Sequence, residues 1–202
     1  MEKILVKKYA SPCGELLLGS FDGRLCLCNW VGTLHPGRVD RRLTSLLDAV
    51  FEYGPSDVTA EAACQLSEYF SGDRKVFDVP LLLLGTGFQK SVWEHLLGIP
   101  YGKTVSYREL ACRCGSPAAV RAVANANGAN AMSVFVPCHR VISSGGNIGG
   151  YAGGAYAKRF LLALERQDGA SVLPLPENCC SDSDNRGSVF NGDAPVGGHS
   201  DR

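Results

Sequence analysis

Hydrophobic and polar residues alternate in short runs at the start of the chain. The runs Lys3 to Tyr9, Glu15 to Phe21 and Leu25 to Val31 are separated by Gly, Pro, Ser or Asp, which favour turns. This pattern predicts three strands joined by hairpins. Apolar residues then recur at spacings of three and four over Asp40 to Phe51 and Val58 to Phe70, which predicts two helices.

Shorter helices with clear start signals follow in the middle of the chain. Thr86 or Gly87 precedes an apolar-periodic run that ends at Gly98. Ser106 and Glu109 have the spacing of a capping box, which predicts a second helix that ends near Gly115.

A third helix in this part has unusually small side chains. Ser116 and Pro117 suit the N-cap and the first position of a helix that runs to about Ala126. With the preceding helix it predicts a tight helix-turn-helix. The one long cation among its small residues, Arg121, suits either a buried helix with an extended Arg or a smooth helix that enters a DNA groove.

The composition is that of an ordinary globular protein. Of 202 residues, 45% are hydrophobic and 20% are charged. The apolar run at residues 4–6 is too short for a secretory signal, and no run approaches the ~20 apolar residues of a membrane span. We therefore expect an intracellular protein with no membrane partner.

The net charge of zero hides an uneven distribution. Residues 1–84 carry 9 basic and 11 acidic side chains, residues 85–166 carry 9 and 3, and residues 167–202 carry 2 and 6. The middle block has a net charge of plus 6 and no aspartate. Such a block indicates a polyanionic partner such as nucleic acid, although a solvated basic surface is the alternative.

The composition also predicts how the chain is divided. From Gln167 it is rich in Gly, Ser, Asp, Asn and Pro, which predicts a disordered acidic tail over 169–202. The change from strands to short helices places a boundary near Leu84. We expect an N-terminal domain over 1–84, which offers no convergent catalytic group and would support the fold, and a second domain over 85–168.

Nine cysteines raise the question of disulfides or metal. Their number is odd, no pair has CxxC spacing, and the chain is large enough to fold without cross-links. We expect most of them to be small buried side chains. A structural zinc site in the N-terminal domain, for instance with Cys26 and His35, is the less favoured alternative, so no metal is predicted.

One cysteine has a reactive setting. The apolar segment 133–136 runs into Pro137, and Cys138, His139 and Arg140 follow directly. A thiol with a pKa of ~8.5 is only a few per cent ionised at neutral pH, so neighbouring His and Arg groups that stabilise the thiolate would make it more nucleophilic. Cys138 is therefore the candidate nucleophile.

Around this cysteine the sequence resembles the O6-alkylguanine-DNA alkyltransferases, also called methylated-DNA-protein-cysteine methyltransferases. The resemblance covers roughly residues 11–166. Several motifs carry it, and they occur in the same order as in the family. They are Phe88, Gln89, Val92 and Trp93; Ile99 to Gly102 with Ser106 and Tyr107; Arg121 to Val123; Pro137 to Val141; Gly149 to Gly154; and Leu161 to Glu165. Two positions depart from the family pattern: Ala131 stands where proline is usual, and Ala124 where glycine is common. They predict a looser or slightly shifted hinge.

The resemblance implies a set of catalytic residues. Cys138 would accept the alkyl group from guanine O6 in a single displacement, which leaves a thioether, so each molecule would act once. His139 would act as base through an ordered water and would be oriented by Glu165. Asn130 would brace the turn before the nucleophile, and Tyr107 would contact guanine N3 and crowd the adjacent phosphate.

The resemblance also implies that duplex DNA is bound with the damaged nucleotide rotated out of the stack. Arg121 would fill the space that the nucleotide leaves. Other contacts to the DNA would come from Tyr107, Arg108, Ser116, Ala119, Ala122 and Ser144. The base would lie in a pocket that contains Ser133, Val141, Gly149, Tyr151 and Ala152.

The fold implied is α+β, with a small N-terminal α/β domain similar to ribonuclease H and a mostly helical, winged-helix-like domain that contains the helix-turn-helix. The implied partner is double-stranded DNA carrying O6-alkylguanine, with O4-alkylthymine as a further candidate. The protein would act as a monomer without a cofactor, in the cytoplasm of a bacterium or the nucleus of a eukaryote.

Two other functions compete with this one. A cysteine hydrolase built on Cys138, His139 and Glu165 would regenerate its thiol with water and turn over repeatedly. A non-catalytic protein that binds alkylated DNA would share the architecture, but such proteins typically lack the acceptor cysteine.

Overall fold

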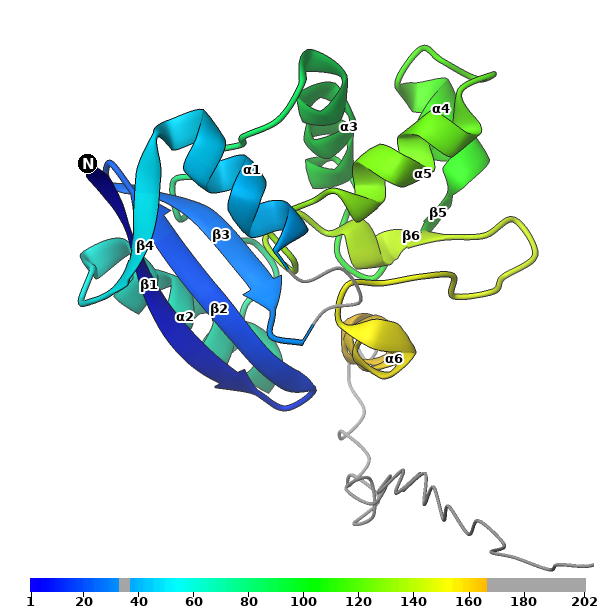
Figure 1. Ribbon diagram of the computed structural model, residues 1–202. Coiled ribbons are helices and arrows are strands. Elements are labelled where there is room, and N and C mark those ends of the chain that lie inside the picture. The colour runs from blue at the N-terminus through cyan, green and yellow to red at the C-terminus, as the bar shows by residue number, and fades with distance from the viewer. Residues whose placement is uncertain (33–36, 167–202) are drawn as a thin grey trace, which may run out of the picture. The chain divides into compact units, whose positions relative to one another are not determined.

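The computed structural model describes residues 1–32 and 37–166 (Figure 1). His35 and the predicted acidic tail lie outside the described residues. Within the described ranges no helix is long and apolar enough to cross a membrane. The fold is mixed α/β, with a sheet formed by the N-terminal part of the chain and helices after it.

The sheet has four strands in the order β3-β2-β1-β4. The three strands predicted at the start are confirmed as β1 (Glu2–Ser11), β2 (Gly14–Phe21) and β3 (Arg24–Trp30), which pair antiparallel in sequence order. The fourth strand, β4 (Ala49–Tyr53), lies parallel to β1 at the other edge.

Strand β4 corrects one prediction. The helix expected over Asp40 to Phe51 is α1 (Arg38–Leu47), and it ends where Asp48 adopts a left-handed conformation with φ of 47°. The following β-branched and aromatic residues pair with β1 instead of continuing the helix. These residues form a strand because the edge of β1 is available for pairing. The helical periodicity of the segment could not reveal that edge.

One helix packs against each face of the sheet. On one face, Leu43 of α1 joins Ile4 and Val6 of β1 in a small apolar cluster. On the other face lies α2 (Asp57–Ser71), the second predicted helix, which buries Leu66 against Leu16 in the main core. Both faces of the sheet are therefore covered, which suits its alternating apolar residues.

The main core continues into the second half of the chain, whose helices are α3 (Gly87–Leu97), α4 (Tyr107–Arg113), α5 (Val120–Gly128) and α6 (Gly154–Arg166). Two short parallel strands, β5 (Val105–Ser106) and β6 (Val141–Ile142), lie between them in the chain.

The helix start signals are confirmed to different degrees. Thr86 caps α3 in a reciprocal capping box with Gln89. Ser106 caps α4 by accepting the Glu109 N–H at 3.0 Å, but the Glu109 side chain pairs with Arg113 and completes no box. The Ser side chain alone is therefore sufficient to start α4.

The start predicted for α5 is wrong by one turn of helix. Ser116 and Pro117 lie in a turn closed by the Ala119 N–H, which donates to the Ser116 carbonyl at 2.9 Å, and the helix begins at Val120. The Ser116 N–H donates to Ala111 at the end of α4, so this serine belongs to the connection. The two helices and their short connection still form the predicted pair (Figure 1).

The outer edge of β3 holds the segment that leads to the candidate nucleophile. The Cys28 N–H donates to the Ala131 carbonyl at 2.9 Å, and the Ser133 N–H donates to the Cys28 carbonyl at 2.7 Å. Met132 thereby forms a parallel bridge with Cys28. The N-terminal sheet thus positions backbone that is more than 100 residues away in the sequence.

Candidate active site

Cys138 begins a short 3-10 helix, η1 (Cys138–Arg140), at the end of a fully buried segment. The segment turns sharply at Val134, whose φ of 73° is strained for a β-branched residue. Such strain persists only where the surroundings hold the backbone firmly. Only 5% of Cys138 is exposed, so the nucleophile lies at the bottom of the site and not on a surface.

The side chain of Asn130 spans this turn. Its Nδ2 donates to the Val136 carbonyl at 2.9 Å, and its Oδ1 accepts the Met132 N–H at 2.9 Å. Both groups are buried, so the amide satisfies backbone atoms that would otherwise lack partners. Asn130 is therefore placed to fix the path of the chain into Cys138.

His139 and Glu165 form a buried pair beside the thiol. The His139 Nε2 lies 2.8 Å from the Glu165 Oε1, and the exposed fraction is 0% for His139 and 3% for Glu165. A carboxylate at Nε2 favours the tautomer that carries the proton there, which leaves a lone pair on Nδ1. That Nδ1 is buried and makes no hydrogen bond within the described part of the chain, so it is free to accept a proton.

Three further groups donate to the same carboxylate. Arg140 binds both oxygens, with Nε to Oε2 at 2.8 Å and Nη2 to Oε1 at 2.9 Å. The Tyr69 hydroxyl donates to Oε1 at 2.7 Å, and the Gly102 N–H donates to Oε2 at 3.1 Å. The structure corrects the expected role of Arg140, because its guanidinium stabilises the Glu165 carboxylate and not the thiolate.

The charges of the site follow from these contacts. Burial alone would raise the pKa of Glu165, but the hydrogen bond with His139 and the hydrogen bonds and positive charge of Arg140 outweigh it and lower the pKa to about 2. Burial lowers the pKa of His139 despite Glu165, so the imidazole is neutral and able to act as a base. Burial raises the pKa of Cys138, opposed by a hydrogen bond from Asn130 and the charge of Lys158. The resting thiol therefore needs a base.

Lys158 is a site residue that sequence reasoning missed. It is fully buried in α6, and its Nζ donates to the Val141 carbonyl at 2.6 Å. Burial lowers its pKa to about 8, and a thiolate at Cys138 acts in the opposite direction. The available signal was its spacing: Lys158 and Glu165 lie seven residues apart on the apolar stripe of one helix.

A cavity of about 270 Å³ opens beside these groups. Its walls include four of the predicted site residues, namely Tyr107, Asn130, Tyr151 and Ala152. Cys138 itself does not line the cavity, but a thiolate there adds to the effect of burial in raising the pKa of both Tyr107 and Tyr151, which do. Val141, Ser133 and Gly149 do not line this cavity.

The glycine-rich stretch between β6 and α6 packs tightly against neighbouring rings. Gly149 has a left-handed φ of 68° and lies against Tyr107, whose hydroxyl would be 3.8 Å from an added Cβ. At Gly153 an added Cβ would be 2.5 Å from the ring of Trp30, which in turn contacts Tyr151 edge-on. Trp30 of β3 is thus a second residue of the site that sequence reasoning missed.

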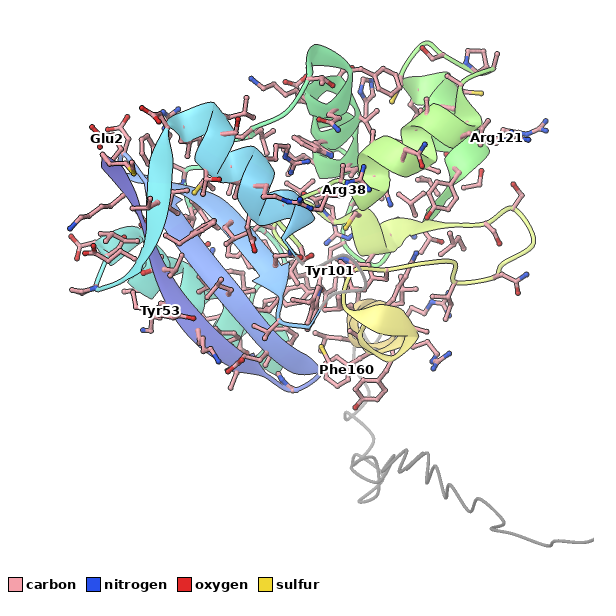
Figure 2. All side chains as sticks on the ribbon, in the orientation of Figure 1. Glu2, Arg38, Tyr53, Tyr101, Arg121 and Phe160 are labelled. Carbon is pink, nitrogen blue, oxygen red and sulfur yellow. The ribbon has the colours of Figure 1, made fainter. Side chains whose placement is uncertain are left out.

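The residues predicted to contact DNA lie on and near the helix pair. Arg108, Arg121, Ala122 and Ser144 are exposed, and Ser116 and Ala119 are half-buried. Figure 2 shows the Arg121 side chain directed away from the body of the protein. The structure does not bring Arg121 into contact with the buried group around Cys138.

The described cysteines are all free thiols, with positions 13, 26, 28 and 138 buried, position 114 half-buried and positions 64 and 112 exposed. Within residues 1–32 and 37–166 no group of three or more His, Cys, Asp or Glu side chains is arranged to hold a metal ion. Cys26 is paired with the Gly19 carbonyl there, at 3.4 Å.

Comparisons with known proteins agree with this geometry. Residues 87–167 match the family described as 6-O-methylguanine DNA methyltransferase, DNA binding domain. A methylated-DNA–protein-cysteine methyltransferase of Mycobacterium tuberculosis is 51% identical over 114 residues, which cover 56% of this chain and 69% of the relative. A constitutive methyltransferase of the same name from Bacillus subtilis is 53% identical over 108 residues, or 53% of this chain and 66% of that protein.

Solved structures extend the similarity beyond the second half of the chain. The M. tuberculosis protein OGT in complex with DNA has a TM-score of 0.69 and 39% identity, over 81% of this chain and 93% of that chain. An O6-methylguanine-DNA methyltransferase from Pyrococcus kodakaraensis has a TM-score of 0.54 and 26% identity, over 82% and 99%. The chain belongs to the methylated-DNA–protein-cysteine methyltransferase family.

Proposed function

We propose that the protein repairs alkylated DNA by direct reversal, transferring the alkyl group of O6-alkylguanine to Cys138. The observation that carries the proposal is the buried thiol beside a neutral imidazole and a cavity, in a chain of this family. An ordinary thiol is mostly protonated at neutral pH, and burial raises the pKa of this one further. His139 supplies the base that it needs, at the unpartnered Nδ1.

The reaction is a single displacement. The thiol proton passes to His139, directly or through water, and Glu165 holds the charged imidazole. The sulfur attacks the alkyl carbon, the bond from that carbon to O6 breaks, and its electron pair stays with guanine, which regains a proton. In sum, the alkyl group moves from oxygen to sulfur and the thiol proton moves to guanine.

The product explains why each molecule would act once. An alkylated cysteine is a thioether, and none of the groups described around Cys138 is equipped to cleave its carbon–sulfur bond. His139 and Glu165 serve to remove a proton from the thiol and offer no route back. The protein would therefore catalyse the reaction of a transferase, but each molecule would react only once. The reaction requires no cofactor.

We infer that the damaged nucleotide is rotated out of duplex DNA to reach this depth. Rotation costs a few kcal/mol, part of which Arg121 would offset by filling the vacated space. The exposed Arg108 and Ser144, with Ser116, Ala119 and Ala122, would contact phosphates and the groove. Tyr107 would contact guanine N3 and Tyr151 would cover the base, with Ser133, Val141, Gly149 and Ala152 around it.

We also propose the type of each domain, the oligomeric state and a second substrate. The sheet would be of the ribonuclease H-like kind and the helix pair part of a winged-helix-like domain, with the boundary near residue 84. The protein would act as a monomer wherever the cell keeps its DNA, and O4-alkylthymine would be a second substrate.

A titration separates this function from a turnover hydrolase. Increasing amounts of a duplex containing O6-methylguanine are incubated with a fixed amount of protein, and restored guanine is measured. We expect the amount of restored guanine to reach a plateau at one guanine per protein. Cys138→Ala should restore no guanine. Continued release of methanol beyond that ratio would establish a hydrolase, and binding without any restored guanine would establish a damage-binding protein.

A further inference from the structure

The cavity near Cys138 is also lined by residues that have no role in the proposed alkyl transfer. These residues come from the N-terminal part of the chain and include Asn29 of β3 and Arg38, Val39 and Arg42 of α1. Figure 2 shows Arg38 at the end of α1 that lies nearest α5 in this view, and residues of both helices line the cavity. Among the described residues that line the cavity, two are arginines and none is acidic.

Arg42 is the unusual member of this group. Its Nε and Nη2 are buried and make no hydrogen bond within residues 1–32 and 37–166. Its guanidinium lies over the Trp93 ring, 5.4 Å from the ring centre, which holds the side chain in place without using its N–H donors. Burial lowers the pKa of Arg42, and the like charge of Arg38 lowers it further. An anion in the cavity would give these two unpartnered donors a partner.

The chemistry of the donors indicates which anion fits. Guanidinium N–H groups form a planar fork that matches phosphate and carboxylate oxygens, and a second arginine one helical turn away adds charge. The same cavity is also lined by Tyr107 and Tyr151, the residues proposed to hold the extruded base. A nucleotide that enters this cavity brings its own phosphate with it.

Resting on the proposed function, we propose that Arg42, assisted by Arg38, binds a backbone phosphate of the DNA strand that carries the extruded nucleotide. The helix pair and α1 would then hold this strand from two sides. Because the contact is to phosphate, it adds affinity without preference for sequence. The N-terminal part of the chain would thus take part in binding DNA as well as supporting the fold.

The test compares Arg42→Met with Arg41→Met. The methionine retains apolar contact with Trp93 and removes one positive charge. Arg41 lies next to it on α1 but is exposed, and its Nε is bonded to the Gly37 carbonyl at 3.1 Å, so Arg41→Met removes the same charge away from the cavity. Duplex affinity is measured across a salt series, together with the rates of transfer from a duplex containing O6-methylguanine and from free O6-benzylguanine.

We expect Arg42→Met to weaken duplex binding roughly tenfold, the loss typical of a hydrogen bond to a charged group. The slope of log affinity against log salt should become shallower by about 0.9, the contribution of one phosphate. The rate with free O6-benzylguanine should stay unchanged. Arg41→Met should leave all three quantities near those of the wild type.

Other outcomes overturn the inference. Equal effects of the two substitutions would show that only overall charge matters, and slower reaction with free O6-benzylguanine would show that Arg42 shapes the base pocket. If Arg42→Met does not fold, Arg38→Met serves in its place, since this exposed residue should give a smaller loss of the same kind. Failure of the wild type to alkylate Cys138 from duplex DNA would refute the proposed function itself, which separates the two claims.

Discussion

At the scale of single residues, the site is organised around one carboxylate. Glu165 accepts hydrogen bonds from His139, Arg140, Tyr69 and the Gly102 N–H, so it is fixed in place and ionised. A carboxylate held in this way sets the tautomer of the imidazole and stabilises the imidazolium that forms when the thiol loses its proton. We therefore expect the reactivity of Cys138 to depend on the residues that hold Glu165 in place.

Tyr69→Phe tests this dependence. It removes the hydroxyl that donates to Glu165 at 2.7 Å and leaves the ring packed in the core. We expect a stability loss of about 1–3 kcal/mol and slower transfer to Cys138. Because the carboxylate would then interact more strongly with His139, the pKa that governs the pH–rate profile should move upward.

Tyr9→Phe is the matched control, because the Tyr9 hydroxyl pairs with Ser67 on an exposed part of α2. It should leave both the rate and the pH–rate profile unchanged. A Tyr69→Phe protein with reduced stability but a wild-type profile would show that Tyr69 is structural only.

Acid stability provides a second prediction at this scale. The pKa of Glu165 is lowered to about 2 in the folded protein, from an ordinary value of 4.5. A lowered pKa contributes stability that is present above the unfolded value, so this contribution of about 3 kcal/mol should disappear as the pH falls from about 5 to 2.

The measurement is the free energy of unfolding in denaturant across that pH range. Glu165→Gln should be less stable than the wild type near neutral pH and should show a flatter dependence on pH. Glu94→Gln, which removes an exposed carboxylate from α3, should follow the wild type. Identical pH profiles for the wild type and Glu165→Gln would contradict the assigned charge.

At the scale of elements, the site is assembled where separate segments meet. The edge of β3 pairs with residues 131–133, α6 supplies Lys158 and Glu165, and the glycine-rich stretch before α6 lies against Trp30. Close approach of backbone to the indole requires glycine at position 153, because a Cβ there would overlap the ring. The glycine-rich stretch is thus anchored on the N-terminal sheet.

Gly153→Ala tests the fit between this stretch and Trp30. The new Cβ would be 2.5 Å from the ring, so the stretch or the indole must move. We expect a loss of stability of about 1–3 kcal/mol, as for other overpacked sites, and slower alkyl transfer because Tyr151 rests on the same ring.

Gly145→Ala in the same stretch is the control, since a Cβ there meets nothing within 4 Å. It should retain the melting temperature and the rate of the wild type. A Gly153→Ala protein that behaves like Gly145→Ala would show that the stretch does not depend on Trp30.

At the scale of the whole molecule, the sequence predicted local structure well and long-range assembly poorly. The first three strands and the capped starts of α3 and α4 follow from alternation and from side chains beside their own backbone. β4 could not be predicted, because its partner β1 lies about 45 residues earlier. The delayed start of α5 depends on a turn held by the end of α4.

The residues of the candidate site also fall into two groups, those that the sequence could identify and those that it could not. Cys138, His139 and Glu165 could be named because their spacing matches a family. Tyr69, Trp30 and Arg42 could not, because each comes from the N-terminal part of the chain and reaches the site only through tertiary packing. The expectation that this part only supports the fold is too narrow for the site that the structure describes.

The central claim is that Cys138 becomes the permanent acceptor of the alkyl group. Its most direct test is mass spectrometry of the protein, intact and after digestion, following incubation with a duplex that contains O6-methylguanine. We expect the mass of one added methyl group, located on the peptide that contains Cys138 and stable over time. An unmodified Cys138 in the presence of repaired DNA, or a methyl group on another cysteine, would contradict it.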